Sequence, residues 1–287
     1  TAVSVALASH LGESEILSAD AFQVYEGMEI LSAAPTPEEQ GGVPHHFVSC
    51  RSPTLGWDAA TFADEARNQL ADLAARTTTA TPIVVGGSGL YLKALTHGLA
   101  PTPKGDPALR AELDALSLDQ LVERYRDIDP EGAAETNLKN RRYVTRNLEI
   151  SLLSGEPASA LKQRWRDNAP DLTAFYLHRE REDIYERIDR RTHAMFSAGV
   201  VAEVAALGDL SETAEKAIGI AEIRSLLAGE IDEATCIANI QQATRRYAKR
   251  QASWFRRETA FEVIAVGSAD SPTDIVGKIL ARLDHWP

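Results

Sequence analysis

The hydrophobic positions of the first hundred residues alternate between helical and extended patterns. Residues 2–11 have the spacing of an amphipathic helix that stops at Gly12, and the apolar run 15–19 that follows has the length of a short strand. A second helical pattern covers 61–76, and a second strand pattern covers 82–85. This alternation predicts an α/β fold with a mostly parallel sheet flanked by helices on both faces.

The pattern changes between residue 101 and about residue 165, where prolines punctuate a series of helical segments and no strand pattern occurs. Strand patterns return at 175–177 and 261–266, with helices between them. We therefore expect a core built from residues 1–103 and 166–287, with an all-helical insertion at 104–165. The sequence contains no internal repeat and no low-complexity tract.

The composition is that of a chain with one sizeable core. Of the 287 residues, 44% are hydrophobic, and no apolar run is long enough to span a bilayer. Cys50 and Cys236 lack metal-ligand spacing, which favours the reducing cytoplasm over a disulfide-rich class. The formal charge of −12 argues against a protein that coats nucleic acid uniformly, although it allows a local basic surface.

One such basic surface is predicted near the end of the chain. Residues 245–257 contain six basic side chains and no acid, and on a helix these fall within an arc of about 140°. The six are Arg245, Arg246, Lys249, Arg250, Arg256 and Arg257. Solvated helix faces usually mix charges of both signs, so the pattern favours RNA contact over an ordinary solvated face.

A carboxylate follows the first predicted strand. Asp20 stands at the carboxyl end of that strand, and in open α/β sheets ligands bind just outside this edge. The alternative is an aspartate that caps a turn. Gly86-Gly87-Ser88-Gly89 follows the second strand, where glycines either let backbone amides approach an anion or form a plain strand-to-helix turn.

Arg191 is the arginine without a neighbouring acid in a predicted helix at 183–196. Asp183 precedes Arg187 by four residues and Glu186 precedes Arg190 by four, so both of these arginines can form surface ion pairs. Arg191 has no such partner, which favours an external anion such as a diphosphate over a distant acid in the fold.

The adjacent His45 and His46 do not form a metal site by spacing. In an extended segment they point to opposite faces, and no third ligand is suitably placed. A structural turn after Pro44 is the interpretation we adopt.

Six ordered blocks carry a family resemblance over nearly the whole chain: 20–28, 35–39, 44–46, 86–91, 185–191 and 244–251. With these blocks the chain resembles the tRNA dimethylallyltransferases, the bacterial isopentenyl-tRNA transferases. The resemblance implies a P-loop NTPase-like core, with the insertion gripping the tRNA anticodon stem-loop. It also implies transfer from dimethylallyl diphosphate to the exocyclic amine of the adenine 3′-adjacent to the anticodon, Mg²⁺ as cofactor, and a cytoplasmic monomer.

The resemblance also assigns roles to residues. Asp20 becomes the general base, Arg191 binds the departing diphosphate, and Thr1 binds the diphosphate and Mg²⁺. Thr1 stands where the last residue of a G-x-x-x-x-G-K-[ST] loop would stand, and we expect the rest of that loop to precede it, outside this sequence. The expected tRNA contacts, with the basic helix included, are Asp20, Ala21, Phe22, Gln23, Ser88, Arg110, Arg142, Arg146, Gly219, Arg246 and Arg250. For Arg146 the alternative is a surface ion pair with Glu149 or Glu135.

The chain departs from the family pattern at three places. Segment 31–35 has Ala34 where the family has a lysine, Ile220-Ala221 replaces a tyrosine and an arginine after Gly219, and 138–140 replaces Pro-Asn-Asp. We expect an intact scaffold with weakened or altered substrate binding.

Three other functions remain open. An adenylate isopentenyltransferase would use a free nucleotide as acceptor, a non-catalytic relative would only bind RNA, and a nucleotide kinase is a weaker alternative. The basic helix and the arginines of the insertion favour tRNA, because a mononucleotide needs neither.

Overall fold

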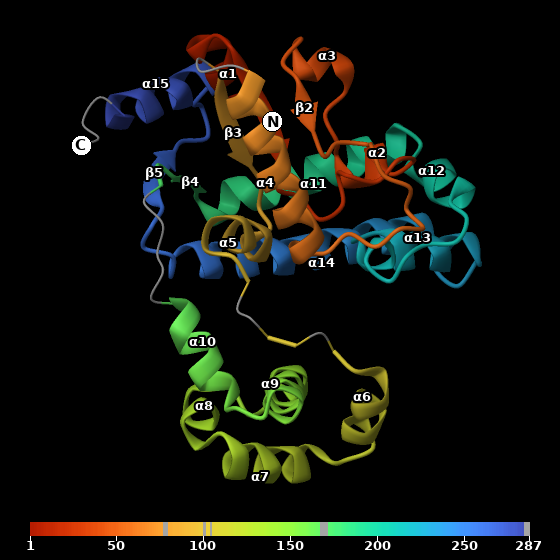
Figure 1. Cartoon of the computed structure of the whole chain (residues 1–287). Helices are drawn as coiled ribbons and strands as arrows, with labels where there is room; N and C mark the ends of the chain where they lie inside the picture. Colours follow the sequence, from red (N-terminus) through yellow and green to blue (C-terminus); the bar gives the residue numbers. More distant parts are fainter. Residues whose placement is uncertain (77–79, 100–101, 104, 167–171, 284–287) are drawn as a thin grey trace. The chain divides into compact units, whose positions relative to one another are not determined.

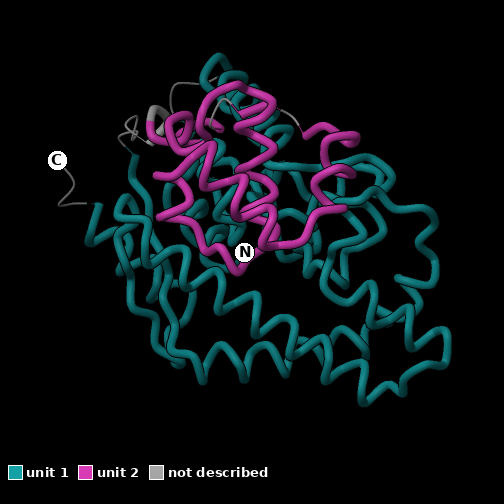
Figure 2. Tube along the Cα trace, turned by 90° about the horizontal axis from the view of Figure 1, so that it is seen from below, with its two compact units in different colours: residues 1–95, 172–287 teal, residues 96–171 magenta. Residues whose placement is uncertain are grey.

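A computed structural model describes residues 1–76, 80–99, 102–103, 105–166 and 172–283. The chain divides into two compact units, which Figure 2 shows in different colours. The core unit comprises residues 1–95 and 172–287, and the helical unit comprises residues 96–171. The division therefore falls a few residues outside the predicted limits at 104 and 165, and residue 104 itself lies outside the described residues.

The strands of the core unit form two parallel sheets. β1 (Ser14–Ser18) lies between β2 (His45–His46) and β3 (Thr81–Val85), and β4 (Phe175–Arg179) pairs with β5 (Glu262–Val266). Every strand pair among the described residues is parallel, which agrees with the predicted α/β class. The parallel sheet predicted for the first hundred residues is confirmed, and β4 and β5 form a second sheet, because no pairing in the described chain joins β3 to β4 or β5.

The turn predicted after Pro44 is wrong. The carbonyl of Pro44 accepts a hydrogen bond from the backbone N–H of Ile16 at 2.9 Å, so the chain continues straight into β2. Ile16 and Leu17 of β1 are in register with His45 and His46. The histidine pair is an edge strand because its backbone is bonded to β1.

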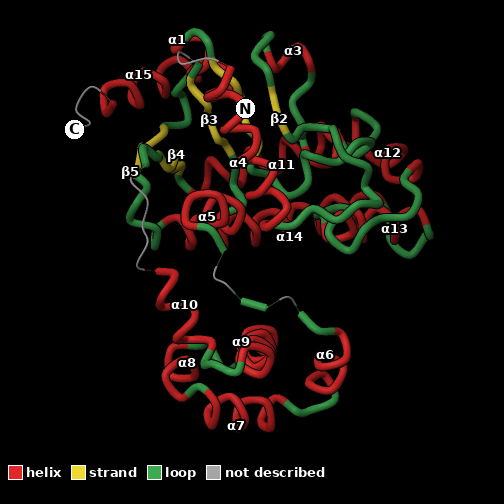
Figure 3. The backbone as a smooth tube through the Cα atoms, viewed as in Figure 1, coloured by secondary structure: helices red, strands yellow, loops and turns green. Residues whose placement is uncertain are grey.

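Helices surround these sheets (Figures 1 and 3). α1 (Ala2–Leu11) packs against β1, β3 and α15 (Pro272–Leu283), and the long α14 packs against α11 and α13. The remaining helices of this unit include two short ones after β1. The bounds are α2 (Glu29–Ser32), α3 (Pro37–Gln40), α4 (Ala59–Arg76), α5 (Gly89–His97), α11 (Arg181–Ser197), α12 (Val200–Ala206), a 3-10 turn (Ala214–Lys216), α13 (Ile220–Leu227) and α14 (Glu233–Phe255).

A large apolar core holds the core unit together. Leu17, Trp57 and Phe62 are almost completely buried in it, and the rings of Phe62 and Tyr91 stack with centroids 5.2 Å apart. Each such side chain contributes roughly 1.5–3 kcal/mol by leaving water. This core fixes the carboxyl end of β1, since Ala19 belongs to it.

The helical unit has its own core. Its helices are α6 (Pro107–Asp114), α7 (Leu118–Ile128), α8 (Pro130–Glu135), α9 (Arg141–Ser154) and α10 (Ala158–Arg166). Leu113, Leu121, Tyr125 and Leu148 are buried between these helices. The helical unit can therefore hold its surface side chains in place by its own packing.

Buried Asp129 joins three helices of this unit. It follows α7 and caps α8, where its Oδ1 accepts a hydrogen bond from the Gly132 N–H at 2.8 Å. Its Oδ2 accepts a second bond from the Ser159 N–H at 2.8 Å, in the first turn of α10. A single carboxylate thus satisfies backbone donors that would otherwise be buried without partners.

Candidate active site and RNA-binding residues

The carboxyl ends of β1 and β3 meet at one edge of the sheet. The two strands are parallel, with Ser18 in register with Val85, and the N–H of Ala19 donates to the Val85 carbonyl at 2.7 Å. Asp20 and the loop 86–89 therefore leave the sheet side by side. This is the edge at which open α/β sheets bind ligands.

Asp20 is both a turn-capping residue and a candidate base. Its Oδ1 accepts hydrogen bonds from the N–H groups of Phe22 at 2.9 Å and Gln23 at 3.3 Å. Its Oδ2 has no hydrogen-bond partner among the residues that the structure describes. Burial raises the pKa of Asp20 and outweighs these two bonds and the attraction of Arg191.

Gln23 is held rigidly beside Asp20. It accepts a hydrogen bond from the Ser18 hydroxyl at 2.9 Å and donates to the Ala33 carbonyl at 3.1 Å. Ala21 and Phe22 pack partly buried against the large core. The predicted acceptor segment 20–23 is therefore an ordered turn on the core.

The glycines of the loop 86–89 make room for protein atoms. A Cβ on Gly87 would lie 2.1 Å from Nε2 of Gln251, and one on Gly89 would lie 2.3 Å from the ring of Trp254. The Gln251 side chain also donates to the Gly87 carbonyl at 2.9 Å. Of the two alternatives, the described contacts therefore support a strand-to-helix turn that is packed against α14.

Tyr247 and Gln251 are site residues that the sequence analysis missed. Burial raises the pKa of Tyr247, hydrogen bonds to Ser88 and Gln251 oppose this, and Asp20 adds to the increase. The i, i+4 spacing of Tyr247 and Gln251 puts both on one face of α14 and was the signal available in the sequence.

Arg191 has no hydrogen bond and no ion pair among the described residues. Desolvation by its surroundings lowers the pKa of its guanidinium, and the Asp20 carboxylate opposes that change. Arg191 lies on an exposed face of α11 and lines a cavity of about 500 Å³. Asp20 is not among the residues that line this cavity, although it acts on Arg191 electrostatically.

Arginines dominate the lining of this cavity. Its polar lining residues are Arg179, Arg187, Arg190 and Arg191. The predicted pairing of Arg187 with Asp183 is wrong, because Asp183 binds Arg179 at 2.7 Å. The predicted pair of Arg190 with Glu186 is also absent from the described ion pairs. The cavity is therefore more cationic than the sequence indicated.

Thr1 stands directly before α1, and its side chain makes no capping hydrogen bond. No group of three or more metal-binding side chains occurs among the described residues, which include His45 and His46. His46 instead contacts Glu15 at 2.7 Å, and Arg76 binds the same carboxylate. Both cysteines are free thiols, with Cys236 buried.

The basic face of α14 is largely as predicted. Arg246, Lys249 and Arg250 are exposed on the helix, whereas Arg256 and Arg257 are exposed directly after its end at Phe255. Arg245 is the exception, because it binds Asp189 of α11 at 2.5 Å and lies over the ring of Tyr185. Its charge is used to join α14 to α11, and we remove it from the predicted RNA-binding face.

In the helical unit, Arg110 and Arg146 both bind Glu149, so the ion pair that was the alternative for Arg146 is present. Arg142 is exposed one helical turn before Arg146, without a hydrogen bond or ion pair in the described part of the chain. Arg141 donates to the carbonyls of Leu113, Asp114 and Leu116 and so caps the end of α6.

Two departures from the family pattern lie against each other. Gly219 begins α13, and the side chain of Leu31 fills the space beside it. Ile220 is fully buried in the core, and Ala34 is partly buried. Leu31 belongs to the segment 31–35 that departs from the family, so the two altered segments form one apolar contact.

No helix in the described part of the chain has the length and apolar character that a membrane span requires.

The chain resembles solved structures over 99% of its length. These include a tRNA isopentenylpyrophosphate transferase from Bacillus halodurans, with 31% identity, a TM-score of 0.68 and 95% of that chain covered. A eukaryotic dimethylallyltransferase acting on tRNA has a TM-score of 0.80 at 22% identity, with 76% of that chain covered, and shows the same fold.

Sequence comparisons agree with this likeness. A tRNA dimethylallyltransferase from Akkermansia muciniphila is 43% identical over 99% of this chain and 96% of its own length. One from Halorhodospira halophila is 39% identical over 90% of this chain and 86% of its own length. The family model described as IPP transferase matches residues 23–258. On these grounds the chain belongs to the IPP transferase family.

Proposed function

We propose that this protein transfers the dimethylallyl group of dimethylallyl diphosphate to the exocyclic amine of the adenine 3′-adjacent to the anticodon of tRNA. Diphosphate is the second product. The observation that carries the proposal is the electrostatic coupling of the Asp20 carboxylate to the unpartnered Arg191 guanidinium beside a cationic cavity. The relatives named tRNA dimethylallyltransferase support it.

The reaction needs a base and an anion site. A bond forms between the adenine nitrogen and the first carbon of the allyl group, while the bond from that carbon to the diphosphate oxygen breaks. The amine proton passes to Asp20, whose Oδ2 is free of hydrogen bonds within the described chain. The raised pKa of Asp20 makes it a stronger base than an ordinary aspartate, as proton transfer from a weak nucleophile requires.

The departing diphosphate gains negative charge as the bond breaks. Arg191 stabilises that charge with a planar, bidentate donor that no protein acid occupies in the described chain. Thr1, whose hydroxyl makes no capping bond, would hold Mg²⁺ together with diphosphate oxygens, since Mg²⁺ is commonly bound by phosphate and a few protein oxygens. When bound, Mg²⁺ supplies further charge neutralisation at the diphosphate.

The acceptor base must leave its stack to reach Asp20, at a cost of a few kcal/mol. RNA contacts made elsewhere offset that cost. We assign these contacts to two basic groups: Arg246 and Arg250 on α14, and Arg110, Arg142 and Arg146 in the helical unit. These residues give a chain of net charge −12 local positive surfaces. We place the reaction in the cytoplasm and assign it to a monomer.

Incubation of the full gene product with dimethylallyl diphosphate, Mg²⁺ and an anticodon stem-loop RNA tests the proposal. Mass spectrometry of the digested RNA should show one prenylated adenosine next to the anticodon, and none with the Asp20→Ala variant. Prenylation of free AMP in place of the RNA would identify an adenylate isopentenyltransferase. Tight RNA binding without transfer by the wild type would identify a non-catalytic relative.

A further inference from the structure

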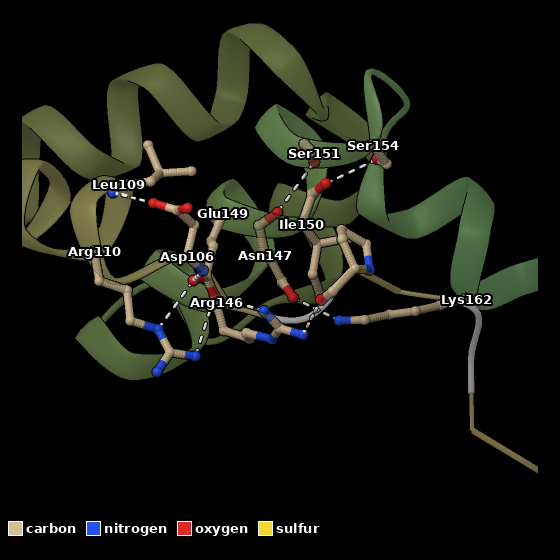
Figure 4. Close-up of polar contacts among 11 residues, drawn as sticks. Asp106, Leu109, Arg110, Arg146, Asn147, Glu149, Ile150, Ser151, Ser154 and Lys162 are labelled. Atoms are coloured by element: carbon tan, nitrogen blue, oxygen red, sulfur yellow. Dashed lines mark hydrogen bonds and ion pairs between the residues drawn. The ribbon is translucent and has the colours of Figure 1, made fainter. Parts of the chain in front are cut away.

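A carboxylate without solvent exposure lies between two arginines of the helical unit. Glu149 of α9 has a relative exposure of 0%. Its Oε1 accepts hydrogen bonds from Arg110 Nε at 2.9 Å and from the backbone N–H of Asp106 at 3.0 Å. Its Oε2 lies 2.5 Å from Arg146 Nη1, and Figure 4 shows both arginines reaching the one carboxylate.

The two arginines themselves are open to solvent. The side chains of Arg110 and Arg146 are 53% and 35% exposed. Each guanidinium has five N–H donors, more than its contacts with Glu149 and the Pro103 carbonyl use. Glu149 is the only acid paired with either arginine within the described residues. Two partly exposed guanidinium groups therefore share one buried carboxylate.

The backbone at Gly105 closes around this cluster. A Cβ at Gly105 would lie 2.2 Å from Arg110 Nη2 and 2.8 Å from Glu149 Oε1. A side chain there would push the Arg110 guanidinium away from its position. The arrangement of the cluster thus depends on a close backbone approach as well as on charge.

We propose that Glu149 is a positioning residue for RNA binding, which holds Arg110 and Arg146 as a preformed two-guanidinium fork for a backbone phosphate of the stem-loop. Arginine side chains lose rotamer freedom when they bind, and a fork ordered in advance loses less. This inference rests on the proposed function, because it names how that function's RNA is held.

In the variant Glu149→Gln, a positioning role and simple electrostatics predict changes of opposite sign in the affinity for RNA. It removes one negative charge beside the phosphate site, so attraction by charge alone would tighten RNA binding. Positioning predicts the reverse: Kd for the stem-loop rises about tenfold, within the range expected for a lost arginine contact. KM for RNA should rise with it, while kcat and KM for dimethylallyl diphosphate stay unchanged.

Glu112→Gln is the matched control, because Glu112 is an exposed acid of the same unit that contacts neither arginine in the described structure. It should leave Kd unchanged or slightly lower it. Gly105→Ala is the second variant, since it displaces Arg110 without altering any charge. It should also weaken binding, and it carries the test if Glu149→Gln does not fold, as judged by circular dichroism.

Binding by Glu149→Gln and Gly105→Ala that is as tight as wild-type binding would overturn the inference. So would Arg110→Ala and Arg146→Ala variants that bind RNA normally, because Glu149 would then have a structural role alone. A wild type that neither binds nor prenylates the stem-loop is a different result. It would instead reject the proposed function itself.

Discussion

Asp20 shows how the chemistry of one residue opposes its contribution to stability. Its pKa is raised in the folded protein by burial, so the folded state binds a proton more tightly than the unfolded state does. The ionised form needed for proton transfer therefore costs folding free energy at pH values above that pKa. The same burial that makes Asp20 a stronger base makes it a poorer structural residue.

The Asp20→Asn variant separates these two effects. We expect the transfer rate to fall about 10²–10⁴-fold, the usual contribution of a general base. The unfolding temperature should stay the same or rise, because Asn keeps an oxygen for the Phe22 and Gln23 N–H groups without the buried charge. Single-turnover transfer and thermal unfolding measure the two, and an unchanged rate would rule out Asp20 as the base.

The free guanidinium of Arg191 gives a second prediction at this scale. Arg191→Ala should raise KM for dimethylallyl diphosphate and weaken inhibition by inorganic diphosphate, each about 10–100-fold, because a charge-assisted hydrogen bond is lost. Arg181→Ala is the control, since Arg181 is exposed on the same helix and does not line the cavity. Equal effects of both variants would point to long-range charge instead of a specific anion site.

At the scale of elements, the sequence pattern predicted where helices and strands lie, because these positions depend on residues that are close together in the chain. The strands β1 and β3 and the helices α1, α4 and α11 lie within about two residues of their expected positions. Pairing over long distances was not predictable. The carboxylate of Asp183 has arginines four residues before and after it, and only the fold selects Arg179.

Candidate site residues divide in the same way. Asp20 and Arg191 could be named because each stands out in its own segment: one follows a strand, and the other lacks a neighbouring acid. Tyr247 and Glu149 were only partly visible in the sequence. Gln251 and Arg146 lie one turn away on the same helices, but Ser88, which bonds Tyr247, and Arg110, which bonds Glu149, come from elements far away in the sequence. Arg245 was misassigned because its acid, Asp189, lies on another helix.

The contact between the loop 86–89 and α14 gives a prediction for these elements. Gly89→Ala should place a methyl group 2.3 Å from the Trp254 ring, so α14 must shift and carry Tyr247 away from Ser88. We expect a loss of about 1–3 kcal/mol in the free energy of unfolding and reduced transfer. Gly208→Ala is the control, because nothing lies within 4 Å of its added Cβ. Urea unfolding with matched transfer assays checks both variants.

At the scale of the whole molecule, two separate cores make the units respond separately. Asp129→Ala leaves the Gly132 and Ser159 N–H groups without their acceptor, and should destabilise the helical unit by about 2–4 kcal/mol. Hydrogen exchange should locate the faster exchange in residues 96–171. Asp127→Ala, an exposed acid two residues away, should have little effect. Faster exchange spread evenly over the chain would contradict the division into units.

Low pH should destabilise both units. Burial alone would raise the pKa of Glu149, but hydrogen bonds from Arg146 and Arg110 outweigh burial and lower that pKa. In the core unit, His46 and Arg76 lower the pKa of Glu15 against burial in the same way. A lowered carboxyl pKa contributes stability that is present above the unfolded value near 4.5 and is lost as pH falls through the folded value. Unfolding free energy measured from pH 7 to pH 3 should therefore fall below about pH 4.5. Glu149→Gln should flatten that fall in the helical unit.

The helical unit interrupts the core unit after Leu95 and returns to it at Leu172, so two peptide connections tether it. Under the proposed function, an RNA bound to one unit meets the other as an intramolecular partner, at an effective concentration set by those tethers. Weak binding to each unit then combines into an avidity that can exceed either affinity by about 10²–10⁴-fold. Under the proposed function an acidic chain can in this way retain RNA with few arginines, and cutting one tether should lower the effective concentration and weaken RNA binding without changing the affinity of either unit alone.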